Sequence, residues 1–303
     1  MRTTQRRAKL PKGELMRRRN FLEFLSLSPG GAILVAKPAN PKTQVASTIF
    51  FSVEVYGDTR GIDVFDISVV TKRVLKACLF EVRPLSDRLP KAIRIENKSG
   101  GPAIWLHAQP QETAWIIIDV AGPYWTQLAY QLGHELGHVL CNSWDVHSKP
   151  EPPSQWLEET LAEAFSIRGL SVLADGWEKD PPFPNNTKYA ESIRQYRANL
   201  IADCMKPVLP DGVPADWRSW AGYGWKPKSP LLGSYDQKGP VTLNVLAEME
   251  ADVRAVEDLG ALNRWADRSR VHVPDYLRLW ERSCREIGSS GKLPRRLLRL
   301  FDL

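Results

Sequence analysis

Residues 131–140, QLGHELGHVL, place two histidines and a glutamate within five positions. The chain of 303 residues contains only five histidines, so such crowding is unusual for its composition. The stretch from Trp125 to Asn142 is strongly apolar and predicts a buried helix. Residues four apart share one face of a helix, so His134 and His138 can direct two imidazoles at one point.

The order His134, Glu135, two further residues and His138 is the HExxH pattern of zinc-binding helices. In this pattern two neutral imidazoles bind Zn²⁺. The glutamate lies too far round the helix to be a ligand and instead reaches the zinc-bound water. The motif therefore predicts a zinc site with Glu135 as general base.

A catalytic zinc site also needs a third protein ligand. The sequence QWLEETLAEAF, residues 155–165, predicts a second helix that begins after Ser154 and carries Glu159. Glu163 lies one turn further along, where its carboxylate can accept the N–H of a ligand histidine. The adjacent Glu158 is a rival third ligand.

Together the two motifs resemble those of the gluzincin metallopeptidases, whose second helix carries a glutamate ligand and an acidic residue four places later. The run 156–159, WLEE, also resembles the Trp-Leu-Asn-Glu run of zinc aminopeptidases, with Glu158 replacing Asn. The resemblance covers residues 114–167 and implies Zn²⁺ bound by His134, His138 and Glu159, with Glu135 as general base in peptide-bond hydrolysis. It further implies that AWIIIDV, residues 114–120, is the edge strand along which a substrate peptide lies.

Peptidases of this family supply a second group for the developing oxyanion from a later Tyr or His. The candidates here are Tyr223, Tyr235 and His147, which the sequence does not rank. The Gly-x-Met-Glu-Asn motif of the exopeptidases is absent, so the resemblance does not imply aminopeptidase specificity.

The remaining pattern predicts an α+β fold. We expect a zincin-like core over residues 44–178, in which a small mixed sheet packs on the HExxH helix and the glutamate-bearing helix. Its predicted strands fall within 45–57, 91–97, 102–108 and 114–120, and a helix covers 63–79. Residues 179–303 form a mainly helical region rich in Trp and Pro, with predicted helices at 188–204, 241–267 and 274–286.

The net charge of +6 lies entirely in residues 1–36, which hold eight basic and two acidic residues. The rest of the chain has 41 − 8 = 33 basic and 35 − 2 = 33 acidic residues, so we expect no nucleic-acid partner. The sequence contains no run of eighteen consecutive apolar residues, so we expect no integral membrane segment. The four cysteines are far apart and predict free thiols rather than a disulfide framework.

Within this basic segment, Arg18-Arg19-Asn20-Phe21-Leu22 precedes a short apolar stretch and resembles a twin-arginine export signal. Glu23 departs from the usual pattern of such signals. Because of this resemblance to an export signal, we expect a periplasmic or secreted protein, with a cytoplasmic location as the alternative.

The sequence thus predicts a zinc metallopeptidase with a peptide or protein substrate and no cofactor beyond the metal. Two alternatives remain open at this point. One is a cytoplasmic zinc peptidase that cleaves a regulator, because HELGHVL and ETLAEAFS also resemble such enzymes. The other is a non-catalytic scaffold, stabilised by zinc, that binds a partner through its Trp-rich loops.

Overall fold

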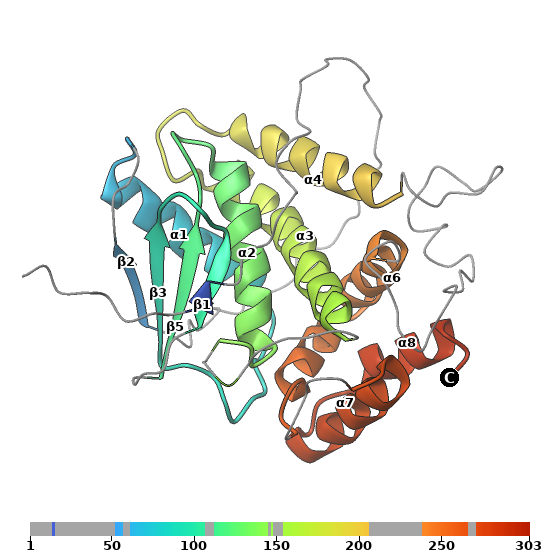
Figure 1. Ribbon diagram of the computed structural model, residues 1–303. Helices are drawn as coiled ribbons and strands as arrows, with labels where there is room; N and C mark the ends of the chain where they lie inside the picture. Colours follow the sequence, from blue (N-terminus) through green and yellow to red (C-terminus); the bar gives the residue numbers. More distant parts are fainter. Residues whose placement is uncertain are drawn as a thin grey trace, which may run out of the picture.

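The computed structural model describes residues 14–15, 52–56, 61–106, 112–144, 147, 154–205, 238–265 and 271–303. In this part of the chain a small sheet lies on one side, and two helices, α1 and α2, pack against it (Figure 1). A long helix, α3, packs on both of them, and the C-terminal helices follow beyond α3. The fold is therefore α+β and mostly helical, with α2 and α3 in its middle.

The sheet is mixed and has the strand order β1-β4-β5-β3-β2. Strands β2, β3 and β5 run parallel to one another, whereas β4 pairs antiparallel with both β5 and β1. The strand bounds are Glu14–Leu15 for β1, Ser52–Tyr56 for β2, Ala92–Asn97 for β3, Ala103–Leu106 for β4 and Thr113–Ile118 for β5. The four strands predicted between residues 45 and 120 are thus present.

Successive side chains along the strands alternate between buried and partly exposed, as expected for a sheet that is covered on one face. In β3, Ile93 and Ile95 are fully buried, whereas Arg94 and Glu96 on the other face are partly exposed. The open face carries a stack in which the Arg94 guanidinium lies 4.1 Å from the centre of the Trp115 ring. Helices α1 and α2 therefore cover the face that carries Ile93 and Ile95.

Strand β5 corrects the prediction that AWIIIDV is an edge strand. It lies between β4 and β3, so both of its edges are paired. The physical reason is visible in the sequence, because Ala114, Ile116, Ile117 and Ile118 are all fully buried and a near-continuous apolar run is typical of a central strand. Strand β5 is paired with β3 along its whole length and with β4 at Ile116 and Ile117.

Helix α1 (Val64–Cys78) begins where the sequence predicts. The Asp63 side chain accepts a hydrogen bond from the backbone N–H of Phe65, which satisfies one of the free donors of the first turn. Apolar residues at helical spacing then bury Ile67, Val70 and Val74 against the core. Helices α2 (Trp125–Leu140) and α3 (Gln155–Lys179) also follow the prediction, although Ser154 makes no side-chain cap at the start of α3.

The C-terminal region is helical as predicted, with one difference. The segment predicted as a single helix over 241–267 is two helices, because Asp252 adopts extended backbone angles (φ −143°, ψ 109°) and caps the second of them. The helices of this region are α4 (Tyr189–Met205), α6 (Lys238–Ala251), the 3-10 helix η2 (Val253–Ala261), α7 (Val273–Ile287) and α8 (Lys292–Leu300).

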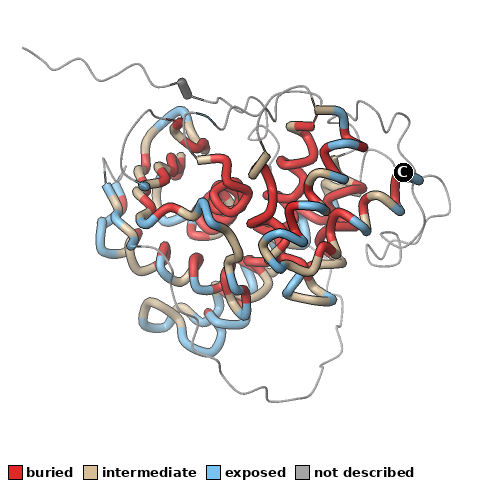
Figure 2. Tube along the Cα trace, turned by 90° about the horizontal axis from the view of Figure 1, so that it is seen from below, coloured by how far each residue is buried: buried red, intermediate tan, exposed pale blue. Residues whose placement is uncertain are grey.

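Buried residues extend from the sheet through α2 and α3 into these C-terminal helices (Figure 2), and they form one hydrophobic cluster. All four cysteines are free, as predicted. Of the helices in the described ranges, none is both long and apolar enough to cross a bilayer. Except for Glu14–Leu15, the predicted export signal at residues 1–36 lies outside the described residues.

Candidate metal centre

Helix α2 carries both histidines of the HExxH motif on its buried side. His134 and His138 are 6% and 2% exposed, and their Nε2 atoms lie only 3.3 Å apart. Two unprotonated imidazoles at this separation leave their lone pairs facing each other, an arrangement that a shared cation relieves.

Two glycines on α2 allow α3 to approach closely. A β-carbon at Gly137 would lie 2.8 Å from Cα of Ala162, and one at Gly133 would lie 2.9 Å from Oγ of Ser166. At Gly137 the obstructing atom is backbone, so only glycine permits the observed spacing of the two helices there, and at Gly133 the Ser166 side chain would have to move. The glycines precede His134 and His138 directly, so the point of closest approach coincides with the histidine pair.

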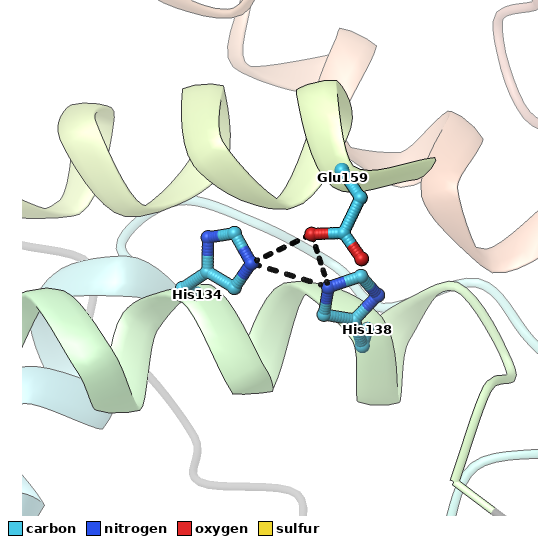
Figure 3. Close-up of side chains that lie close together, drawn as sticks. All are labelled: His134, His138 and Glu159. Atoms are coloured by element: carbon cyan, nitrogen blue, oxygen red, sulfur yellow. Dashed lines mark hydrogen bonds and ion pairs between the residues drawn. The ribbon is translucent and has the colours of Figure 1, made fainter. Parts of the chain in front are cut away.

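This close packing brings Glu159 from α3 onto the two imidazoles. Glu159 Oε2 lies 3.4 Å from His134 Nε2 and 3.8 Å from His138 Nε2. Figure 3 shows the carboxylate pointing from α3 toward both rings on α2. These three residues are all buried, and within the described ranges they form the one group of His, Cys, Asp or Glu side chains that could hold a metal ion.

The size of this triangle fits a tetrahedral zinc ion. Ligand atoms placed about 2.0–2.1 Å from a zinc ion at tetrahedral angles lie about 3.3 Å from one another. The three separations here are 3.3, 3.4 and 3.8 Å, so only Glu159 needs to shift, by less than about 0.5 Å, to complete the set. The residues present therefore have the donor types and the spacing that a His₂Glu metal site requires, and zinc is a metal that such a set can hold.

The other nitrogen of each imidazole faces a carboxylate from α3. His138 Nδ1 is 2.7 Å from Glu158 Oε1, and His134 Nδ1 is 3.5 Å from Glu163 Oε2. A carboxylate at Nδ1 favours the tautomer that carries its proton there, which leaves Nε2 free to bind a metal. Glu158, the rival third ligand of the sequence prediction, thus lies on the far side of His138 from Glu159.

Glu163 is held ionised by its neighbours. Both of its oxygens accept from the Tyr130 hydroxyl, at 2.8 and 2.9 Å, and Lys238 Nζ lies 3.1 Å from Oε2. Burial by itself raises the pKa of this carboxyl, but the charge of Lys238 and the contacts with His134 and Tyr130 outweigh it and lower the pKa to about 2. Glu163 is therefore an anion at neutral pH and can accept a proton-bearing Nδ1.

Residues of the C-terminal region hold the Glu158 carboxylate in place. Its Oε2 accepts a hydrogen bond of 2.9 Å from Nδ2 of Asn263, and Oδ1 of Asn263 accepts one of 2.8 Å from the Tyr276 hydroxyl. Lys238, Asn263 and Tyr276 were not predicted as site residues. They lie 75 to 118 positions from the glutamates that they serve, and no spacing rule connects them to HExxH.

The other predicted site residues are only partly located. Glu135 lies on α2 between the two histidines and is fully buried. His147 is exposed in a turn that follows α2. Tyr223 and Tyr235 lie outside the described residues.

Comparisons with family models, with curated proteins and with solved structures give no match to this chain. The functional interpretation therefore rests on the two motifs and on the geometry of the site.

Proposed function

We propose that this protein is a zinc-dependent peptidase that hydrolyses peptide bonds with Glu135 as general base. The observation that carries the proposal is the triangle of His134 Nε2, His138 Nε2 and Glu159 Oε2, which has the dimensions of a His₂Glu zinc site. A carboxylate next to the first ligand histidine distinguishes this arrangement from a purely structural zinc site, which is closed by four protein ligands.

The chemical role of each residue follows from its position in the site. A zinc ion held by His134, His138 and Glu159 supplies a Lewis acid for the attacking water and for the substrate carbonyl. Glu135 takes a proton from the water molecule while the oxygen of that water attacks the carbonyl carbon. It then passes that proton to the amine nitrogen as the C–N bond breaks. Glu158 and Glu163 keep both imidazoles in the metal-binding tautomer throughout.

Burial of the site supports a catalytic role. The three proposed metal ligands and Glu135 are 0 to 6% exposed, so charges interact there more strongly than in water. The substrate is a peptide or an unstructured protein segment in this proposal, because the chemistry requires access to a backbone carbonyl.

The decisive experiment separates metal binding from catalysis. Glu135→Gln keeps the size of the side chain but removes the base, so we expect near-stoichiometric zinc, an unchanged melting temperature and a rate of cleavage lower by ~10²–10⁴-fold. Glu163→Ala is the comparison variant. It removes the partner of His134 Nδ1, so both zinc affinity and activity should fall, by ~10–100-fold.

Zinc content, melting temperature and cleavage of a denatured protein should be measured for the wild type and both variants. If Glu135→Gln cleaves as fast as wild type, the peptidase mechanism is wrong. A zinc-containing wild type with no cleavage of any unfolded substrate would favour the zinc-stabilised scaffold instead.

A further inference from the structure

Asn263 links the C-terminal helical region to the metal centre. It lies just after η2, is 4% exposed and adopts a left-handed backbone conformation (φ 55°). Its Nδ2 donates to the carbonyl oxygen of Cys141 at 2.8 Å and to Glu158 Oε2 at 2.9 Å, and it lies 3.1 Å from Ser143 Oγ. One side chain thus contacts both the end of α2 and the carboxylate that faces His138.

We propose that Asn263 is a positioning residue for the metal ligand His138 and acts through Glu158. The inference rests on the metal centre of the proposed function and goes beyond it, because it makes residues after 238 part of that centre. Glu158 Oε1 faces His138 Nδ1 while Oε2 is held by the Asn263 amide, so the carboxylate is fixed at both oxygens.

The Tyr276 hydroxyl sets the direction of this contact. It donates to Oδ1 of Asn263 at 2.8 Å, so the amide presents its N–H groups to Glu158 and to the Cys141 carbonyl. In the reversed orientation an amide oxygen would face a carboxylate and a carbonyl, which is repulsive. Tyr276 therefore donates to Asn263 and Asn263 donates to Glu158, and the Glu158 carboxylate accepts from Asn263 at one oxygen and from His138 Nδ1 at the other.

A second asparagine supplies a matched control. Asn142 is also left-handed (φ 60°), 5% exposed and located where α2 meets the turn after η2. Its Nδ2 donates to the carbonyl oxygens of Gly260 and Leu262, at 3.0 and 2.7 Å. Both asparagines hold the same two segments together. Asn142 Oδ1 accepts a hydrogen bond of 2.7 Å from Ser86 Oγ, and neither end of this amide contacts Glu158 in the hydrogen bonds of the described residues, whereas Asn263 holds Glu158.

The test compares Asn263→Gly with Asn142→Gly, because glycine accepts a positive φ at both positions. Zinc affinity is measured by chelator competition, the visible spectrum by Co²⁺ substitution, and stability by melting of the metal-free protein. We expect both variants to melt lower than wild type. Only Asn263→Gly should lose metal affinity, by ~10–100-fold, and shift the Co²⁺ absorption bands.

Equal zinc affinities and identical Co²⁺ spectra in the two variants would overturn the role of Asn263 and leave the metal centre intact. A wild type that binds neither ion would overturn the metal centre and this inference with it. If Asn263→Gly does not fold, Tyr276→Phe carries the same test, because it removes only the hydroxyl that orients the amide. A Tyr276→Phe spectrum identical to wild type would then count against the proposal.

Discussion

Replacing Gly137 by alanine tests whether the close approach of α2 and α3 builds the metal centre. The added methyl would lie 2.8 Å from Cα and 3.1 Å from Cβ of Ala162. Carbon atoms pack at about 3.5 Å or more, so the helices must separate by roughly 3.5 − 2.8 = 0.7 Å. Overpacking of this kind costs about 1–3 kcal/mol, whereas alanine gains about 1 kcal/mol over glycine in a helix.

The net expectation is a loss of stability of about 0–2 kcal/mol, together with a damaged zinc site. A shift of α3 by ~0.7 Å moves Glu159 away from His134 and His138, and zinc coordination tolerates only about 0.2 Å. Retention of zinc should therefore fall more than the stability alone would suggest.

Gly176→Ala is the matched control, because Gly176 lies near the end of α3 with no atom within 4 Å of its missing β-carbon. This variant should be as stable as wild type or more stable, by up to about 1 kcal/mol. Because the gain from replacing glycine by alanine in a helix is common to both variants, they should differ by the overpacking cost of about 1–3 kcal/mol, which at ~2–4 °C per kcal/mol is about 2–12 °C in melting temperature. The assay is thermal melting of the metal-free proteins and zinc content after dialysis. If Gly137→Ala matches Gly176→Ala in both, close packing is not what assembles the site.

Three further predictions concern the ligands, the C-terminal region and the location of the protein. Glu159→Gln should reduce zinc retention far more than Glu158→Gln, because a glutamine at 158 can still accept from His138 Nδ1; the reverse order in a zinc titration would reassign the third ligand. Asp252 caps η2 and pairs with Lys292 and Arg254, which lowers its pKa, so its contribution to stability is present above about pH 4 and declines as the pH falls further. Asp252→Asn should accordingly melt lower than wild type at pH 7, with a gap that narrows below pH ~4; a gap independent of pH would contradict the charge assignment. Replacement of Arg18 and Arg19 by lysines should block export in a host with an intact twin-arginine system, and an unprocessed protein found only in the cytoplasm would refute the export signal.

The local elements of this protein could be predicted from its sequence because their signals are short-range. The helical spacing of apolar residues places α1, α2 and α3 within a few residues of their observed ends. The i, i+4 spacing of His134 and His138 likewise predicts one shared face without any tertiary information. The single helix predicted over 241–267 is wrong because Asp252 adopts an extended conformation and caps η2 by accepting from the backbone N–H of Arg254.

The tertiary structure decided which of several chemically equivalent side chains contacts each imidazole nitrogen. Glu158 and Glu159 are neighbours of identical chemistry, and only the packing of α3 against Gly133 and Gly137 directs Glu159 to both Nε2 atoms and Glu158 to Nδ1 of His138. The sequence likewise carries no sign of Asn263, because its contact with Glu158 spans 105 positions. Local spacing specifies the face on which a residue lies, whereas the partner it meets there depends on how that face packs against the rest of the chain.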